Sequence, residues 1–242
     1  MFEAAIVGVA LIAGGVAAIS GFGIGSLLTP LFAVRLGTKL AVAVVSVPHV
    51  VGTAVRFAKL WRQVDRKLLL QFGILSAVGG LIGGLLNSRA NSAVLTIVFG
   101  FLLISAGVSS LIGLFQRLHL GRVTAWIAGL LSGLFGGLVG NQGGIRSAAL
   151  LAFDIPKENF VATATAIALI VDGARMPFYF ITQYQQMLDA WPLMLLAIVG
   201  VVAGTIWGVP LMRKIPEPIF RRGVAILVII LGIYMIVQGF RG

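Results

Sequence analysis

Residues 136–148 read GGLVGNQGGIRSA, and they interrupt an apolar run that extends from 123 to 153. A helix that crosses ~30 Å of hydrocarbon needs about 20 apolar residues, so this run is too long for a single crossing. The glycines allow the backbone to turn sharply at the centre of the run. The sequence GFGIG at 21–25 interrupts a second long run, residues 4–34, in the same way.

The composition of the chain indicates an integral membrane protein. Hydrophobic residues make up 59% of the 242 residues and charged residues only 10%, which leaves too little polar surface to cover a globule in water. The net charge of +11 comes mostly from short gaps between apolar runs, where basic residues set topology, so we expect no nucleic-acid partner. Without cysteines or a histidine cluster, we expect no metal and no other cofactor.

The two interrupted runs have matching positions in a predicted duplication. A shift of 119 positions superposes Gly21 on Gly140, Gly25 on Gly144 and Arg56 on Arg175. We predict a first repeat at 1–119 and a second at 120–242. Besides the long runs 4–34 and 123–153, the predicted helices are 40–58, 68–86 and 92–114 in the first repeat, and 159–181, 192–211 and 223–240 in the second.

The charges of the loops distinguish a straight long helix from a hairpin. If each long run crossed the membrane once, the basic residues outside the runs would divide 7 against 8 between the two sides. If each run returns to its own side, they divide 11 against 4, as the enrichment of Lys and Arg in cytoplasmic loops requires. We therefore predict an all-α integral membrane protein with two inverted repeats, each of three transmembrane helices and a glycine-broken half-membrane hairpin. It would be a multi-pass plasma-membrane protein with both termini on the non-cytoplasmic side.

The two glycine breaks are the candidate binding site. The helices that restart at about Ser26 and Ile145 would aim their N-terminal amides, the positive ends of their dipoles, at the middle of the membrane, which favours an anion. Asn141 and Gln142 add two amide side chains at the same depth. The alternative is that the glycines only allow close helix packing. The candidate substrate-binding residues are Gly21, Phe22, Gly23, Gly25, His49, Asn141, Gln142, Gly143, Gly144, Arg146, Ser147, Asp172 and Arg175.

Three arginines lie inside apolar runs, where a charge costs ~2.5–3.5 kcal/mol and usually faces an interior or a cavity. Arg146 follows the second break directly. Arg175 lies three residues after Asp172 on one helix face, so the two can pair, either as part of the site or as a neutralised pair that holds the bundle together. Arg56 lies three residues before Lys59, so snorkelling to the interface is an alternative for it.

His49 and Asp172 are the candidates for proton coupling. A histidine can take up a proton near neutral pH, although His49 could equally be a neutral hydrogen-bonding residue between helices. Asp172 is the only acid well inside an apolar run.

GFGIGSLLTPLF at 21–32 and the segment 132–175, which contains NQGGIRSA, resemble the sulfite exporter TauE/SafE family, and NQGGIRSA resembles one branch of it. The resemblance implies an inverted-repeat bundle that transports anions, often sulfur oxyanions or organosulfonates such as sulfite or sulfoacetate. It carries over the glycines of the first motif and, in the second, Asn141 to Gly144, Arg146 and Ser147. Ile24 departs from the family, which often has a glycine there.

The expected function is a secondary transporter or facilitator of a small anion, bound at mid-membrane, with one half rocking against the other. One alternative is a membrane scaffold subunit that transports nothing. Another is an intramembrane serine enzyme with Ser132 or Ser147 as nucleophile, but such chemistry needs a base within hydrogen-bond reach and the chain has no GxSxG or HExxH. The exact substrate, the direction, the coupling ion and the oligomeric state, a homo-oligomer included, stay open.

Overall fold

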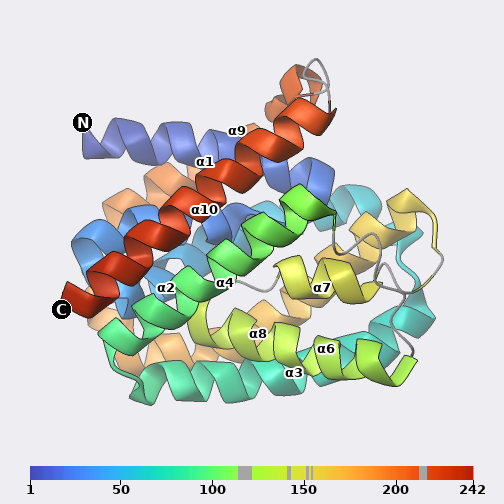
Figure 1. The fold of residues 1–242 in the computed structure, drawn as a ribbon, viewed down its shortest axis with the longest axis horizontal. Coiled ribbons are helices and arrows are strands. Elements are labelled where there is room, and N and C mark those ends of the chain that lie inside the picture. The colour runs from blue at the N-terminus through green and yellow to red at the C-terminus, as the bar shows by residue number, and fades with distance from the viewer. Residues whose placement is uncertain (114–121, 141–142, 151–152, 154, 213–216, 242) are drawn as a thin grey trace.

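The computed structural model describes residues 1–113, 122–140, 143–150, 153, 155–212 and 217–241 (Figure 1). Every regular element in this part of the chain is helical, which confirms the all-α prediction. The elements are α1 (Phe2–Ser20), α2 (Ile24–Leu60), a short 3-10 helix (Trp61–Gln63), α3 (Arg66–Arg89), α4 (Ser92–Ile112), α6 (Arg122–Val139), α7 (Gly143–Leu150), α8 (Lys157–Asp189), α9 (Trp191–Met212) and α10 (Glu217–Arg241).

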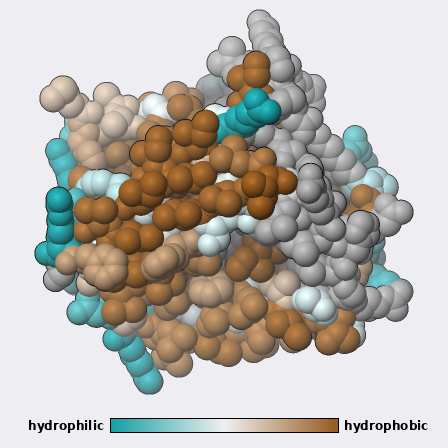
Figure 2. Space-filling view, in the orientation of Figure 1, coloured by the Kyte–Doolittle hydropathy of each residue, from teal (hydrophilic) through white to brown (hydrophobic). Residues whose placement is uncertain are grey.

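Six of the described helices are long and apolar enough to cross a membrane, and further apolar helices are shorter. Large apolar side chains on their outer faces are exposed, among them Phe101 and Ile230, each 57% exposed. Figure 2 shows one face of the molecule with hydrophobic residues across its middle and hydrophilic ones gathered at its edge. Such a surface is stable in lipid rather than in water, so the chain is a multi-pass membrane protein.

The first long run is a hairpin. Helix α1 ends at Gly21, whose left-handed conformation (φ 81°) lets its N–H donate to the carbonyl of Ala17. Helix α2 starts at Ile24 and runs back, so that the guanidinium of Arg35 lies 4.0 Å from the ring centroid of Phe2 at the beginning of α1. The run therefore returns to the end of the bundle from which it started.

The arms of this hairpin are unequal, whereas the sequence suggested a half-membrane hairpin broken at its centre. Helix α1 has 19 residues and is itself a candidate span. The return arm ends at Gly37, where the backbone (φ 72°, ψ 155°) leaves the helical region. Positive φ begins only at Gly21, so the first helix continues unbroken through Gly14 and Gly15.

The second long run has the same form. Helix α6 ends at Gly140, which also adopts positive φ (74°), and α7 begins at Gly143. Helix α7 packs on α6 and runs back alongside it (Figure 1). The two positive-φ glycines that end the first arms, Gly21 and Gly140, are 119 residues apart, as the predicted duplication requires (140 − 21 = 119).

The two predicted repeats are intertwined. Helix α1 packs on α9, α3 on α6 and α4 on α10, so each pair joins a helix from 1–119 to one from 120–242. Glycines let the backbones touch: a Cβ on Gly79 or Gly83 would overlap carbonyl oxygens of α6, and a Cβ on Gly204 would overlap the carbonyl oxygen of Leu11. Because lipid is as apolar as Leu, close packing of this kind stabilises the bundle. Rocking of one sequence half against the other would pull all three pairs apart. The repeat boundary and the inversion themselves stay predictions.

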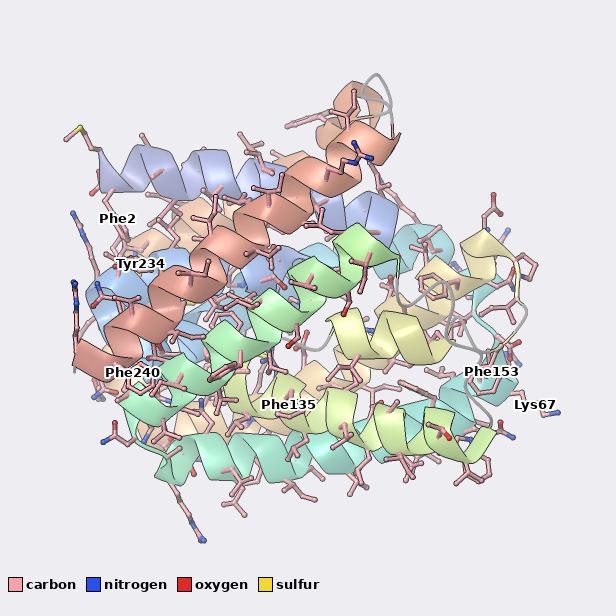
Figure 3. All side chains as sticks on the ribbon, viewed as in Figure 1. Phe2, Lys67, Phe135, Phe153, Tyr234 and Phe240 are labelled. Carbon is pink, nitrogen blue, oxygen red and sulfur yellow. The ribbon has the colours of Figure 1, made fainter. Side chains whose placement is uncertain are left out.

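Two of the connections that loop charge assigns to one side, the described residues 59–67 and 155–158, lie at one end of the bundle. There the backbone N–H of Asp65 donates to the hydroxyl of Thr163, at 2.9 Å, which ties the start of α3 to the start of α8. Figure 3 shows Lys67 and Phe153 at this end, and Phe2, Tyr234 and Phe240 at the opposite end, where both termini lie. This grouping matches the hairpin arrangement inferred from loop charge. Which end faces the cytoplasm stays a prediction.

One predicted connection is wrong. The polar stretch from Thr182 to Asp189 was expected to be a loop, but α8 continues through it with a kink at Gln183 (φ −135°). Gln, Met and Leu favour helix, so the polarity marks where the chain leaves the apolar layer rather than where the helix ends.

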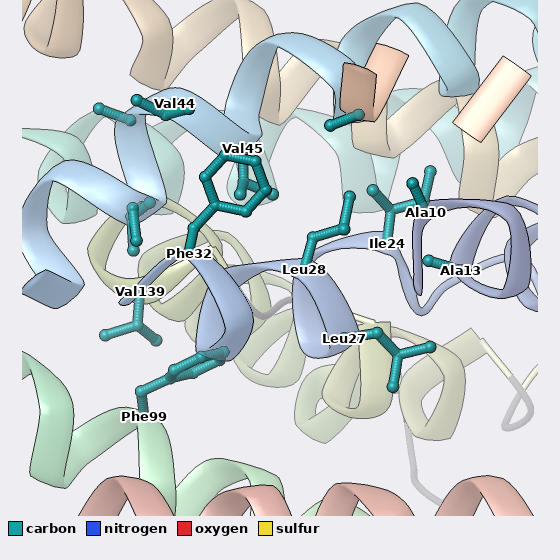
Figure 4. Close-up of a cluster of buried hydrophobic side chains, with 14 of the residues drawn as sticks. Ala10, Ala13, Ile24, Leu27, Leu28, Phe32, Val44, Val45, Phe99 and Val139 are labelled. Carbon is teal, nitrogen blue, oxygen red and sulfur yellow. The ribbon is translucent and has the colours of Figure 1, made fainter. Parts of the chain in front are cut away.

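The return arm of the first hairpin lies at the centre of the core. Ile24, Leu27, Leu28 and Phe32 are at most 2% exposed. Figure 4 shows them surrounded by side chains of α1, α2, α4 and α6, including Ala10, Val44, Phe99 and Val139. This packing holds the start of α2, and with it the first glycine break, deep inside the bundle.

Candidate functional site

The two glycine breaks touch one another. A Cβ on Gly25 would overlap the carbonyl oxygen of Gly140, and a Cβ on Gly143 would overlap the side chain of Phe22. Both pairs join the break before α2 to the break before α7, although they are more than a hundred residues apart in the sequence. The two glycine breaks, which the sequence placed at the middle of the membrane, are therefore in contact in the fold.

Both return arms start at this meeting point. Gly23 (φ 130°) is the N-cap of α2, with no side-chain cap, and Gly143 is the first residue of α7. Gly144, Arg146 and Ser147 follow within α7, whereas Asn141 and Gln142 lie outside the described residues. The first amides of a helix have no partner within the helix and carry its positive dipole end, so both helix starts present donors to the same region.

The sequence did not single out Ser20, which shapes the first break. Its hydroxyl donates to the carbonyl oxygens of Val16 and Phe22, each at 2.8 Å. These bonds hold the chain between the two arms in its turn. A serine directly before GFGIG is the signal that would have found it.

His49, Asp172 and Arg175 form one hydrogen-bonded group. Nδ1 of His49 donates to Oδ2 of Asp172 at 2.6 Å, and Nε and Nη2 of Arg175 lie 2.9 and 2.7 Å from Oδ1 of the same carboxylate. All three residues are buried, with exposed fractions of 6%, 0% and 1%. The i,i+3 pair was expected from the sequence. The bond to His49, which joins α2 to α8, was not.

The alternative that Arg56 snorkels to the interface is wrong. Arg56 is 3% exposed and points inward, with Nε donating to the hydroxyl of Thr165 and Nη1 to the carbonyl of Ala17, both at 2.8 Å. These bonds place the guanidinium of Arg56 beside the first glycine break. Arg175 has the equivalent position beside the second glycine break.

Arg146 is the third buried arginine, with 1% of its surface exposed. Arg56, Arg175 and Asp172 all act on it electrostatically. Among the described residues, the cluster thus contains three buried guanidinium groups and one buried carboxylate, an excess of two positive charges when His49 is neutral (3 − 1 = 2). Buried charges are costly unless they are compensated, so this arrangement favours a bound anion.

Two buried hydroxyl groups extend the cluster and were not identified from the sequence. The side chains of Thr29 and Thr53 are 0% exposed, and neither Oγ1 has a hydrogen-bond partner in the described part of the chain. Thr29 lies close to the second glycine break. If Gly140 carried a Cβ, that atom would lie 3.6 Å from Thr29 Oγ1 and also 3.6 Å from Arg175 Nη1. Thr53 lies between His49 and Arg56 on one face of α2. A buried donor without a partner is uncommon, so both hydroxyls are candidates for ligand contact.

A polar cavity of about 300 Å³ lies away from this cluster, between α2, α4 and α10 at the end that carries both termini. Thr38, Asn91, Ser92, Thr96, Tyr234 and Gln238 supply its polar lining. The hydroxyls of Thr38 and Thr96, both in its lining, are 2.5 Å apart. The side chains of the charged cluster are buried.

The family model of the sulfite exporter TauE/SafE matches residues 6–235, nearly the whole chain. No curated protein and no solved structure matches the chain. The chain therefore belongs to the sulfite exporter TauE/SafE family, and this membership implies a membrane transporter of sulfur-containing anions.

Proposed function

We propose that this chain is a secondary transporter or facilitator of a small sulfur oxyanion or organosulfonate, such as sulfite or sulfoacetate, and that the anion binds where the two glycine breaks meet. The observation that carries the proposal is that, among the described residues, three buried arginines, Arg56, Arg146 and Arg175, surround one buried carboxylate, that of Asp172. A cation or a neutral solute would leave the excess positive charge uncompensated.

The proposed contacts combine the described helix starts with the amide side chains that the sequence places between them. Backbone amides at the start of α2, at Gly25, and at the start of α7, at Gly143 and Gly144, would bind oxyanion oxygens. Asn141 and Gln142 would donate side-chain hydrogen bonds, and Arg146 would balance the charge together with Arg175. Glycine at these positions lets a ligand approach the backbone closely.

The packing favours a moving unit other than a sequence half. Helices α1, α2 and α9 pack on one another, as do α3, α6, α7 and α8, and the two groups meet mainly where α2 lies on α8. The charged cluster spans that contact through His49–Asp172 and Arg56–Thr165. Alternating access would then come from movement of these two groups across the site, with α4 and α10 packed as a separate pair.

The test is flux through purified protein in liposomes loaded with sulfite, sulfate or sulfoacetate. Arg146→Ala should lower the flux of the transported anion about tenfold or more, because a hydrogen bond to a charged group contributes about 1.5–3 kcal/mol. Arg62→Ala, an exposed arginine at the end of the bundle, is the matched control and should transport like the parent. Equal flux in both variants would remove Arg146 from the site, and no flux of any anion by the parent protein would favour the scaffold alternative.

A further inference from the structure

The bond between His49 and Asp172 joins α2 to α8 within the charged cluster beside which the anion is proposed to bind. The two atoms are 2.6 Å apart, and both side chains are almost fully buried. The second oxygen of Asp172 is already occupied by Arg175. Because Nδ1 of His49 donates to a carboxylate, the imidazole can carry a second proton on its other nitrogen as an ion-paired imidazolium.

The charged groups around His49 come from few elements. Helix α8 contributes Asp172, Arg175 and Tyr179, and α2 itself contributes Arg56; the ionic groups among these act on the imidazole electrostatically. Arg146 of α7 acts on the same carboxylate. Helices α4 and α9 contain no ionisable side chain, Glu3 of α1 is exposed at the far end, and the acidic and basic residues of α10 lie outside its central turns.

We propose that His49, held by Asp172, binds a proton that crosses the membrane together with the anion. This inference rests on the proposed function and names its coupling ion. With His49 neutral, the described residues of the cluster carry two excess positive charges, and protonation adds a third, which is unfavourable while the site is empty. An anion beside Arg146 and Arg175 offsets that charge, so anion and proton stabilise one another.

The coupling is reciprocal. If the anion increases the affinity of His49 for a proton by some factor, protonation increases the affinity for the anion by the same factor. The affinity for the anion should therefore rise as the pH falls. One proton accompanies each anion: a monoanion then crosses without net charge, and a dianion carries one net negative charge.

The experiment separates coupling from transport in liposomes. The parent protein should accumulate anion against its gradient when the outside is acidified, and should also exchange labelled for unlabelled anion with no pH gradient. His49→Gln keeps a hydrogen-bond donor for Asp172 but cannot carry the proton. Because His49 is itself a candidate site residue, exchange should slow in this variant, but its rate should no longer change with pH and proton-driven accumulation should be lost. His119→Gln replaces the chain's other histidine and should behave like the parent.

A second measurement needs no variant. In weakly buffered detergent solution near pH 7, addition of saturating anion to the parent protein should take up about one proton per anion bound. Absence of proton uptake, or proton-driven accumulation by His49→Gln equal to that of the parent, would overturn the inference while leaving anion transport intact. Absence of anion exchange by the parent would instead contradict the proposed function.

Discussion

Arg56 and Arg175 make the same hydrogen bond at two places in the fold. Nη1 of Arg56 donates to the carbonyl of Ala17 at 2.8 Å, and Nη1 of Arg175 donates to that of Gly136 at 2.6 Å. The arginines are 119 residues apart (175 − 56) and so are the carbonyls (136 − 17). Each guanidinium thus ties a long central helix to the last turn before a glycine break. The two arginines differ in the partner of Nε. Nε of Arg175 donates to the carboxylate of Asp172, whereas Nε of Arg56 donates to the neutral hydroxyl of Thr165.

The two arginines should therefore differ in their effect on stability. Arg175→Met leaves the carboxylate of Asp172 buried with one partner fewer, and removing one member of a buried pair costs about 3–5 kcal/mol. Arg56→Met removes a charge whose described bonds go to neutral groups and should destabilise less. Denaturant or thermal unfolding in detergent measures the difference, and Arg175→Met combined with Asp172→Leu should recover much of the loss. Equal destabilisation by both single substitutions would contradict this assignment.

Thr29 should matter for the ligand and not for the fold. Its hydroxyl is buried with no hydrogen-bond partner among the described residues, so Thr29→Val removes an unsatisfied polar group and should leave the stability of the empty protein unchanged or higher. The stabilisation by added anion, measured as a shift in Tm, should fall. Thr165→Val is the contrasting variant, because it deletes the partner of Arg56 and should destabilise the empty protein. An unchanged anion-induced shift in Thr29→Val would exclude that hydroxyl from the site.

The contact between the two breaks should not tolerate a single added carbon. In Gly25→Ala the new Cβ would overlap the carbonyl oxygen of Gly140, so the breaks would have to separate, and we expect anion flux to fall about tenfold or more, since overpacking costs about 1–3 kcal/mol. Gly173→Ala is the control. It lies in α8 beside Asp172, is exposed, and has nothing within 4 Å of the new carbon. That variant should keep its flux and gain about 0.5–1 kcal/mol of stability. Normal flux in Gly25→Ala would show that the tight contact is dispensable.

The arrangement of the hairpins predicts that the two ends of the bundle face opposite sides of the membrane. Since the chain has no cysteine, single cysteines can be introduced at Glu3 and at Arg62, both exposed at opposite ends of the molecule. A membrane-impermeant maleimide should label position 3 from outside the cell and position 62 only in inverted vesicles, because the basic connections are expected in the cytoplasm. Labelling of position 62 from outside would reverse the proposed orientation, and labelling of both from one side would contradict the hairpins.

Much of the architecture follows from local sequence. Apolar runs longer than one crossing, each with glycines at its centre, predicted the two hairpins, because only glycine takes the positive φ that Gly21 and Gly140 adopt. The division of basic residues among the loops predicted that each run returns. Hydropathy could not place the helix ends, since α8 stays helical beyond its apolar part and α1 is longer than a half-membrane arm.

The sequence by itself determined a helical membrane bundle, its two reversals and the position of three arginines inside apolar runs, because run length, glycine and charge act locally along the chain. Only the tertiary structure decided that His49 bonds Asp172, 123 positions away, that Arg56 turns inward, and that Thr29 has no hydrogen-bond partner among the described residues. Those outcomes depend on how each helix is rotated when α2 packs on α8 and the glycine-lined pairs close. Side-chain partners across such contacts are set by packing geometry, which has no local signature in the chain.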